Sequence, residues 1–180
     1  MRLRHLLEVT RPSSMFTAAQ ELKKHGWVWL SQGGFSELYE NPKYRYVLKL
    51  YANEDIAYTQ FIAFTRQYPS PHWPKFIGLP VKVTKDYSAI RIERLRPLLR
   101  SDTAINVVQT MNSYLNDLFY KKAARWVEKI REWPSMFQAL DDLYYHLVQP
   151  DEEGIAVDIS LSNTMLRGKT LVLTDPVTPP

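Results

Sequence analysis

Two acidic residues and one asparagine near the C-terminus have side chains that could move a proton and hold a magnesium ion. Asp158 and Asn163 enclose the run Asp-Ile-Ser-Leu-Ser-Asn after one apolar stretch, and Asp175 closes a second apolar stretch. A carboxylate can accept the proton of a hydroxyl group, and Mg²⁺ binds few protein carboxylates together with phosphate oxygens. The spacing predicts a site for such chemistry. Either acid alone could equally be a turn residue, because Asp-Pro is a common turn dipeptide.

Two features in the first third of the chain could contact the phosphates themselves. Gly33 and Gly34 lie in a turn between two expected strands, where backbone N–H groups could approach a phosphate closely. Lys49 lies inside an apolar strand and could direct one positive charge at a ligand. Taken singly, the glycines could form an ordinary hairpin turn, and Lys49 could lie on the solvent face of an edge strand.

The order of these features along the chain is more informative than any one of them. A glycine turn, a strand lysine, a helix, two strands, several helices, Asp-x-x-x-x-Asn, a strand and a final Asp follow one another. Phosphoryl transfer depends on such parts for positioning and for charge neutralisation. The ordered set therefore predicts an enzyme that transfers a phosphoryl group.

This arrangement resembles the protein-kinase-like superfamily. It is most similar to the kinase domain of the early host-takeover serine/threonine kinases of lytic bacteriophages and to kinase-like proteins of related prophage origin. The resemblance extends from about residue 27 to residue 178, and its matching stretches are Gly33–Tyr39, Val47–Lys49, Ala57–Phe61, Pro74–Gly78, Asp158–Met165 and Leu173–Val177.

The resemblance implies ATP and Mg²⁺ as cofactors and a serine or threonine hydroxyl on a host or self protein as the acceptor. Asp158 would be the catalytic base, Asp175 the principal magnesium ligand and Asn163 the second magnesium ligand. Lys49 would pair with the α- and β-phosphates and belongs with Asp158 to the catalytic set. The cofactor-binding residues that the resemblance implies are Gly33, Gly34, Ser36, Lys49, Glu93 and Leu95, of which Glu93 and Leu95 fall where the adenine-contacting hinge belongs.

The sequence departs from the kinase pattern in its loops. Ser31 stands where the first loop glycine belongs, and Ser160 and Ser162 replace the histidine and glycine often seen between the catalytic Asp and Asn. Pro176 follows Asp175 in place of glycine, as it does in the phage relatives. These departures bear on rate and substrate more than on nucleotide binding.

The partner of Lys49 and the substrate-docking surface are not settled by the sequence. Glu54 or Asp55 could pair with Lys49, whereas Tyr58 occupies the position that a simple helix register would give the acid. The chain also ends shortly after Asp175, without an activation segment or the later helices that usually dock a peptide.

The pattern of apolar residues predicts the elements that position these side chains. Ser13, Ser14 and Thr17 could cap a first helix that runs to about residue 25 and ends at Gly26. Strands are expected at 27–30, 36–39, 44–51, 76–83 and 88–93, a helix at 55–67, helical stripes at 105–119 and 136–147, and a hairpin of 155–157 with 171–173 around the turn 167–170.

These elements predict an α+β, minimal bilobal fold of the protein-kinase-like type. We expect an N-terminal helical extension at 1–26, an antiparallel β-rich N-lobe with one inserted helix at 27–95, and a truncated helical C-lobe at 96–180.

Composition excludes several other classes of protein. The chain has 180 residues, no cysteine and a net charge of +4. It therefore has no disulfide scaffold, thiol nucleophile or cysteine-ligated metal. No apolar run approaches the roughly 18–20 residues of a membrane span. We expect a protein of the bacterial host cytoplasm with no membrane partner.

Three alternatives to a protein kinase remain open. The first is a weak or inactive pseudokinase that binds and inhibits a host protein, and the second is a small-molecule phosphotransferase. The third is direct nucleic-acid binding. We do not expect nucleic acid as a partner, because strand packing explains the aromatic residues Trp27, Trp29, Tyr44 and Tyr46 better.

Overall fold

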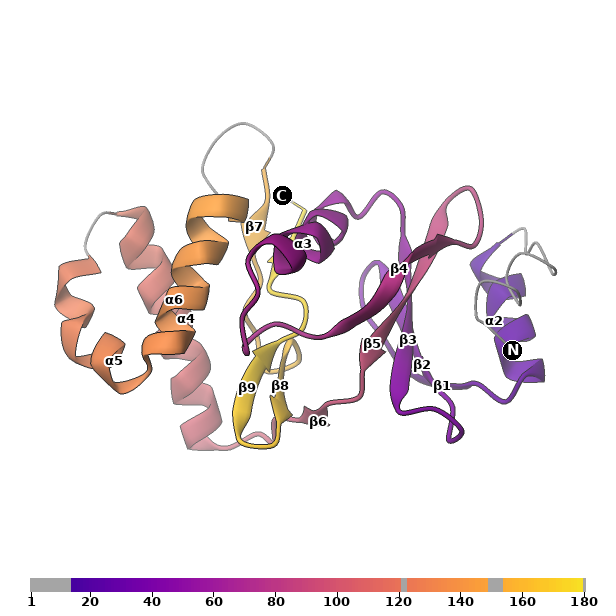
Figure 1. The fold of residues 1–180 in the computed structure, drawn as a ribbon, viewed down its shortest axis with the longest axis horizontal. Helices are drawn as coiled ribbons and strands as arrows, with labels where there is room; N and C mark the ends of the chain where they lie inside the picture. Colours follow the sequence, from indigo (N-terminus) through magenta and orange to yellow (C-terminus); the bar gives the residue numbers. More distant parts are fainter. Residues whose placement is uncertain (1–13, 121–122, 149–153, 180) are drawn as a thin grey trace. The chain divides into compact units, whose positions relative to one another are not determined.

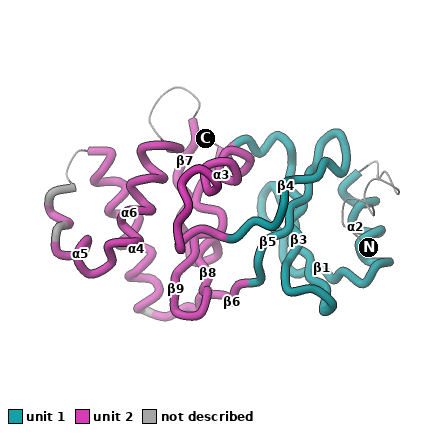
Figure 2. Tube along the Cα trace, viewed as in Figure 1, with its two compact units in different colours: residues 1–56, 75–94 teal, residues 57–74, 95–180 magenta. Residues whose placement is uncertain are grey.

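A computed structural model describes residues 14–120, 123–148 and 154–179 and shows an α+β fold. The chain divides into two compact units (Figure 2). Residues 1–56 and 75–94 form the first unit, and residues 57–74 and 95–180 form the second. Contacts thus group residues 57–74 with the second unit, while the predicted lobes 27–95 and 96–180 stay predictions.

Over its described residues, the first unit contains a five-stranded antiparallel sheet and the helix α2 (Figure 1). The strands have the order β1-β2-β3-β5-β4. All five strands expected from the sequence are confirmed, with ends shifted by at most two residues. The elements are α2 (Met15–Lys24), β1 (Val28–Gln32), β2 (Ser36–Glu40), β3 (Tyr46–Ala52), β4 (Phe76–Lys82) and β5 (Tyr87–Glu93).

Helix α2 begins and ends as its sequence predicts. Ser14 caps it, because the Ser14 hydroxyl accepts a hydrogen bond from the Thr17 backbone N–H while the Thr17 hydroxyl accepts one from the backbone N–H of Ser14. The helix ends before Gly26, whose φ of 79° is a conformation that glycine adopts without strain. Ser13, the other expected cap, lies outside the described residues.

One face of the sheet packs against α2. Ala18 and Leu22 of the helix join a buried cluster with Trp27, Tyr39 and Leu48. Successive strand residues point to opposite faces, so Lys49, the residue after Leu48, lies on the other face of the sheet. The register places Lys49 between Leu38 of β2 and Ile90 of β5.

The aromatic residues of this region are only partly used in packing. Trp27 stacks on Tyr44 with ring centroids 5.5 Å apart, and Tyr44 stacks on Tyr46 at 5.1 Å. Trp29 is different, since 55% of its surface is exposed. The prediction that Trp29 is a packing residue is wrong, because it lies on edge strand β1, all of whose side chains are exposed.

The second unit contains most of the helices and the C-terminal strands. A core lies where α4 meets α6: Tyr114 packs edge-on against Phe137 at 4.6 Å, and the Tyr114 hydroxyl donates to Asp141 at 2.6 Å. The elements are α3 (Ile56–Gln67, in this unit from residue 57 on), β6 (Arg96–Pro97), α4 (Asp102–Phe119), the 3₁₀ helix η1 (Ala123–Trp126), α5 (Val127–Glu132), α6 (Pro134–Leu143), the π-helical turn η2 (Tyr144–Val148), β7 (Ala156–Val157), β8 (Thr164–Arg167), β9 (Thr170–Leu173) and β10 (Val177–Thr178).

The predicted C-terminal hairpin needs a correction. The turn is where the sequence placed it, but β9 pairs with β8, and the stretch 155–157 contributes β7, which pairs with β10. The prediction paired the two most apolar runs on either side of the turn and overlooked β8, which directly follows the polar loop 158–163. The observed pairings bring both ends of that loop close to residues 174–176.

Within the described residues, no helix combines the length and the apolar character that crossing a membrane would require.

Candidate functional site

The second unit brings Asp158 and Asn163 into direct contact. The side-chain amide of Asn163 donates to the Asp158 carboxylate oxygen Oδ2 at 2.7 Å and to the Asp158 backbone carbonyl at 3.0 Å. Asn163 Nδ2 is thereby used twice, and the contact orients the carboxylate. Asp158 itself is exposed, so its carboxylate can be reached from solvent.

Backbone hydrogen bonds hold Asp175 beside this loop. The backbone N–H of Asp158 donates to the carbonyl of Pro176 at 2.8 Å, and the N–H of Thr174 donates to the carbonyl of Asn163 at 2.8 Å. Both neighbours of Asp175 in the chain therefore bond to the loop that carries Asp158 and Asn163. The three residues that the sequence selected for proton transfer and magnesium lie in one cluster, which we call the 158–163–175 cluster.

Serines 160 and 162 complete the loop. Their hydroxyls are 2.8 Å apart, and the Ser160 carbonyl accepts a hydrogen bond from the Thr164 hydroxyl at 2.8 Å. The two residues that depart from the kinase pattern thus support the loop through local hydrogen bonds.

Asn112 on α4 anchors the same loop from outside. Its side-chain amide donates to the backbone carbonyl of Ile159 at 2.8 Å. Ile159 directly follows Asp158 and is buried. Sequence reasoning missed Asn112, because a single asparagine on a helical stripe carries no signal of a contact that spans 47 residues.

His72 holds the hairpin of the cluster in place. Its Nδ1 lies 2.8 Å from the carbonyl of Leu171, and its Nε2 lies 2.9 Å from the Ser135 hydroxyl. A carbonyl can only accept, so Nδ1 carries the proton and Nε2 accepts from Ser135. Burial lowers the pKa of His72, and the nearby charge of Arg167 lowers it further, whereas the hydrogen bond to Leu171 opposes this. His72 is a structural residue here, because both of its ring nitrogens are used in hydrogen bonds within the fold.

Lys49 and the glycine turn lie in the first unit. Lys49 is buried, with 4% of its surface exposed, in the middle of β3. The turn before it is closed by hydrogen bonds from the Gly33 N–H to the Ser36 carbonyl at 2.8 Å and from the Ala52 N–H to the Phe35 carbonyl at 2.9 Å. Burial excludes the interpretation of Lys49 as a residue on the solvent face of an edge strand.

The two turn glycines are not required by backbone geometry. Neither Gly33 nor Gly34 has a positive φ, and a Cβ built on Gly34 would meet nothing within 4 Å. A Cβ on Gly33 would lie 3.2 Å from the Ser36 hydroxyl. The fold therefore gives no reason for glycine at position 34, which keeps a ligand-related reason open.

The remaining predicted residues lie at the ends of elements. Glu93 closes β5, and its carboxylate accepts a hydrogen bond from the Lys75 backbone N–H at 2.8 Å. Leu95 opens the later segment of the second unit. Of the two acids that could pair with Lys49, Asp55 is buried and Glu54 is exposed.

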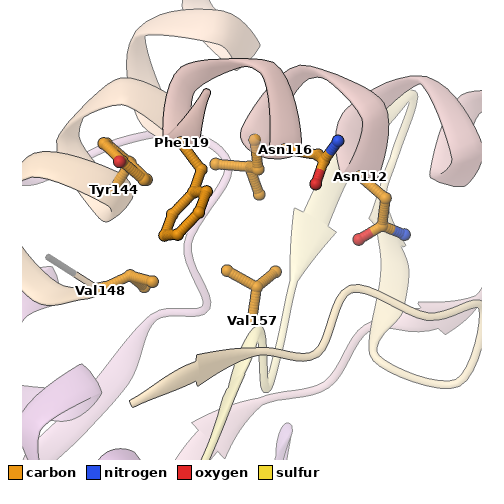
Figure 3. Close-up of a pocket in the computed structure, with 7 residues that line it drawn as sticks. Asn112, Asn116, Phe119, Tyr144, Val148 and Val157 are labelled. Carbon is orange, nitrogen blue, oxygen red and sulfur yellow. The ribbon is translucent and has the colours of Figure 1, made fainter. Parts of the chain in front are cut away.

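A pocket of about 310 Å³ lies beside the cluster in the second unit (Figure 3). Figure 3 shows the ring of Phe119 and the side chain of Val157 facing its open space, with Tyr144 and Val148 at one side. Val157 directly precedes Asp158, but no residue that the sequence selected for chemistry lines the pocket. The pocket is largely apolar and is separate from the proposed catalytic groups.

The donor set of the cluster fits a magnesium ion. Over the described residues, no three His, Asp or Glu side chains gather into a metal cage. Mg²⁺ needs no such cage, since it keeps several waters and binds through one or two carboxylates plus substrate phosphates. Asn163 uses its Nδ2 on Asp158, so its side-chain oxygen Oδ1 is the atom that would hold a metal ion, together with the carboxylate of Asp175. The residues present are therefore suitable for Mg²⁺ bound together with phosphate oxygens.

Comparison with known proteins adds no constraint on these roles. The chain matches none of the protein-family models against which it was scanned, and a search of curated proteins found no match.

Proposed function

We propose that this protein is a small protein-kinase-like phosphotransferase that uses ATP and Mg²⁺ to phosphorylate a serine or threonine of a host or self protein. The observation that carries the proposal is the 2.7 Å contact between the side chains of Asn163 and Asp158, beside an acid, Asp175, that closes the following hairpin. Under the proposal, it would join the proton acceptor Asp158 to one magnesium ligand, Asn163, in one loop, with Asp175 on the adjacent segment after β9.

The antiparallel sheet of the first unit supports the same proposal. Protein kinases carry the phosphate-contacting lysine on the third strand, after a glycine-rich turn. Lys49 is in β3, follows the Gly33–Gly34 turn, and is buried on the sheet face opposite α2. Under this proposal, the Lys49 ammonium group would contact a bound phosphate.

Each residue of the cluster has a defined task under this proposal. Asn163 holds Oδ2 of Asp158, so Oδ1 of Asp158 is the atom that accepts the proton of the substrate hydroxyl. The Oδ1 of Asn163 and the carboxylate of Asp175 would hold Mg²⁺. Magnesium-bound ATP supplies the phosphoryl group and neutralises charge on its phosphates. Asn112 fixes the position of the loop relative to α4 through its hydrogen bond to Ile159.

The direct test is phosphate transfer from labelled ATP by the parent and by Asp158→Ala. General-base catalysis is typically worth about 10²–10⁴-fold in rate. Asp158→Ala should lose transfer by that order while keeping its ATP-dependent rise in melting temperature. Lys169→Ala, an exposed change in the β8–β9 turn, is the control and should transfer phosphate at a rate within a few-fold of the parent.

Three results would contradict parts of the proposal. Parent-level transfer by a folded Asp158→Ala would remove the catalytic role of Asp158. A parent that binds ATP but transfers nothing, alone or with host lysate, would favour the pseudokinase alternative. A parent that binds no ATP would refute both.

A further inference from the structure

The two edges of the five-stranded sheet are built differently. Edge strand β4 contains Gly78, Pro80 and Lys82, and its register with β5 shifts between Ile77 and Val81. Glycine, proline, charge and irregular pairing are devices that protect a sheet edge from further strand addition. Edge strand β1 reads Val-Trp-Leu-Ser-Gln and has no proline, glycine or charge, although one bulge occurs between Trp29 and Ser31. In the part of the chain that the structure describes, no strand pairs with the outer side of β1.

A groove runs beside this open edge. It encloses about 520 Å³ and is lined by residues of α2 and β1 and by Trp27 and Tyr39 in the first unit. Trp29 pairs with Tyr39, so both rings lie on the sheet face that α2 covers. Phe16 on the helix side is 70% exposed, and Trp29 and Val28 on the strand side are each more than half exposed. The groove is therefore a largely apolar surface open to solvent.

The groove carries one charge. Its lining residues are Phe16, Ala19, Gln20, Lys23, Trp27, Val28, Trp29 and Tyr39. Lys23 is exposed, and no carboxylate among the described residues pairs with it, whereas the neighbouring Lys24 pairs with Glu21 at 2.5 Å. Among the described residues that line the groove, Lys23 is the one charged contact that a ligand would meet.

We propose that β1 and this groove bind an extended, acidic segment of another protein. The segment adds a strand alongside β1, so its main chain supplies hydrogen bonds and alternate side chains reach the groove. Apolar or aromatic side chains pack on Trp29 and Phe16, and a carboxylate faces Lys23. This inference does not depend on the phosphotransferase proposal.

Charge favours a different protein over a second copy of this chain. None of the eight lining residues is acidic. A second copy that paired its β1 with this β1 would bring an uncharged strand and another Lys23, so neither lysine would gain an anionic partner. A segment with an acidic residue can form an ion pair with Lys23.

The test uses peptides selected from a displayed library of random twelve-residue sequences against the full chain. Enriched peptides should combine β-branched or aromatic residues with an aspartate or glutamate and lack a central proline. The dissociation constant of the most enriched peptide is then measured by calorimetry. N-methylation of one alternate set of peptide amides should abolish binding, while methylation of the other set should not, because only one set faces β1.

Two surface variants locate the binding site. Trp29→Ala should weaken the peptide by about tenfold or more, as loss of an interface tryptophan does. Lys23→Glu should weaken it several-fold, and exchange of the peptide acid for lysine should restore binding to that variant. Lys24→Glu, one residue away and outside the groove, should bind the parent peptide as the parent chain does.

Several results would overturn the proposal. Among them are failure to enrich any peptide, equal effects of both methylation sets, and peptides insensitive to both Trp29→Ala and Lys23→Glu. A concentration-dependent dimer of the parent that Trp29→Ala abolishes would also overturn it, by assigning the edge to a second copy.

Discussion

Asn163 is the residue on which the geometry of the candidate site depends. Its side-chain amide donates to both the carboxylate and the backbone carbonyl of Asp158, and its backbone carbonyl accepts from the N–H and the hydroxyl of Thr174. Asn163 therefore connects Asp158 to the segment after β9 that carries Asp175. An aspartate at this position has nearly the same shape but cannot donate.

Asn163→Asp tests this contact without any assumption about catalysis. The variant replaces a charge-assisted hydrogen bond at 2.7 Å by two facing carboxylates. We expect the free energy of unfolding at pH 7 to fall by about 1 kcal/mol, a value reduced for the exposure of Asp158. Salt screens the repulsion between the two carboxylates, so the loss should shrink at about 1 M salt. Urea unfolding at low and at high salt measures it, and an equal loss under both conditions would contradict the contact.

Gly34 is the residue at which a ligand role and a folding role can be separated. Its backbone is not strained and its Cβ position is open, so Gly34→Ala should leave the melting temperature within about 2 °C of the parent, as a surface change does. Close approach of a phosphate to the backbone would still be hindered by the added methyl group. We expect weaker ATP binding by Gly34→Ala, measured by calorimetry, whereas unchanged affinity would make the turn an ordinary hairpin.

At the scale of elements, the sequence was most informative where one face of a strand or helix is apolar. The strands of the sheet were predictable because β-branched and aromatic residues alternate in short runs between glycines and prolines. Strand β8 was missed because only two of its four residues, Met165 and Leu166, are apolar. Local propensity yields to tertiary contacts at such places.

The supports of the site were beyond sequence reasoning for a different reason. His72 reaches Leu171 across 99 residues, and Asn112 reaches Ile159 across 47. A single polar residue in a loop or helix does not show which distant carbonyl it will contact. The candidate residues themselves could be chosen from their types and order, whereas the contact of Asp158 with Asn163 required coordinates.

The loop 69–74 and the β8–β9 hairpin form one hydrogen-bonded assembly with a titratable residue in it. Besides His72, Arg167 of β8 donates to the carbonyls of Pro71 and Trp73 at 2.8 Å each. His72 is therefore placed among a cation and polar groups that suit its neutral form. Its protonation would remove the acceptor that Ser135 uses and add a charge near Arg167.

This arrangement predicts a dependence of stability on pH. Because the pKa of His72 is lower in the folded than in the unfolded protein, the unfolded chain binds more protons between the two values. Folding stability is then complete above the unfolded value of about 6.5 and falls as pH drops from there to the lower folded value. His72→Gln should be less stable at pH 8 but lose much of the slope below pH 6.5. His25→Gln, an exposed control, should keep the parent slope, and a parent without this slope would contradict the assignment.

At the scale of the whole molecule, the proposed function assigns roles to residues in each unit, which can be tested separately. Lys49 belongs to the first unit, and Asn163 and Asp175 belong to the second. A ligand that binds the folded chain stabilises it by RT ln(1 + [L]/Kd), which is about 2.7 kcal/mol at a hundredfold excess over Kd. The proposal predicts that substitution of an assigned residue reduces this stabilisation by ATP.

The melting temperature with ATP, with and without Mg²⁺, separates the two contributions. For a chain of this length, about 2.7 kcal/mol corresponds to a rise of roughly 5–10 °C. The parent should show its full rise only with Mg²⁺. Lys49→Ala should lose most of the rise under both conditions, because under the proposed function Lys49 contacts the phosphates of ATP directly. Asp175→Asn should keep the rise seen without Mg²⁺ and lose the increment that Mg²⁺ adds, since an amide is a weaker ligand than a carboxylate.

The control for charge removal is Lys85→Ala, an exposed lysine in the β4–β5 turn, which should behave as the parent does. An equal rise with and without Mg²⁺ in the parent would count against the 158–163–175 cluster as a metal site. A normal rise in Lys49→Ala would count against Lys49 as a phosphate contact, whatever the result for Asp175→Asn. Because the two substitutions lie in different units, each outcome tests its own part of the proposed site.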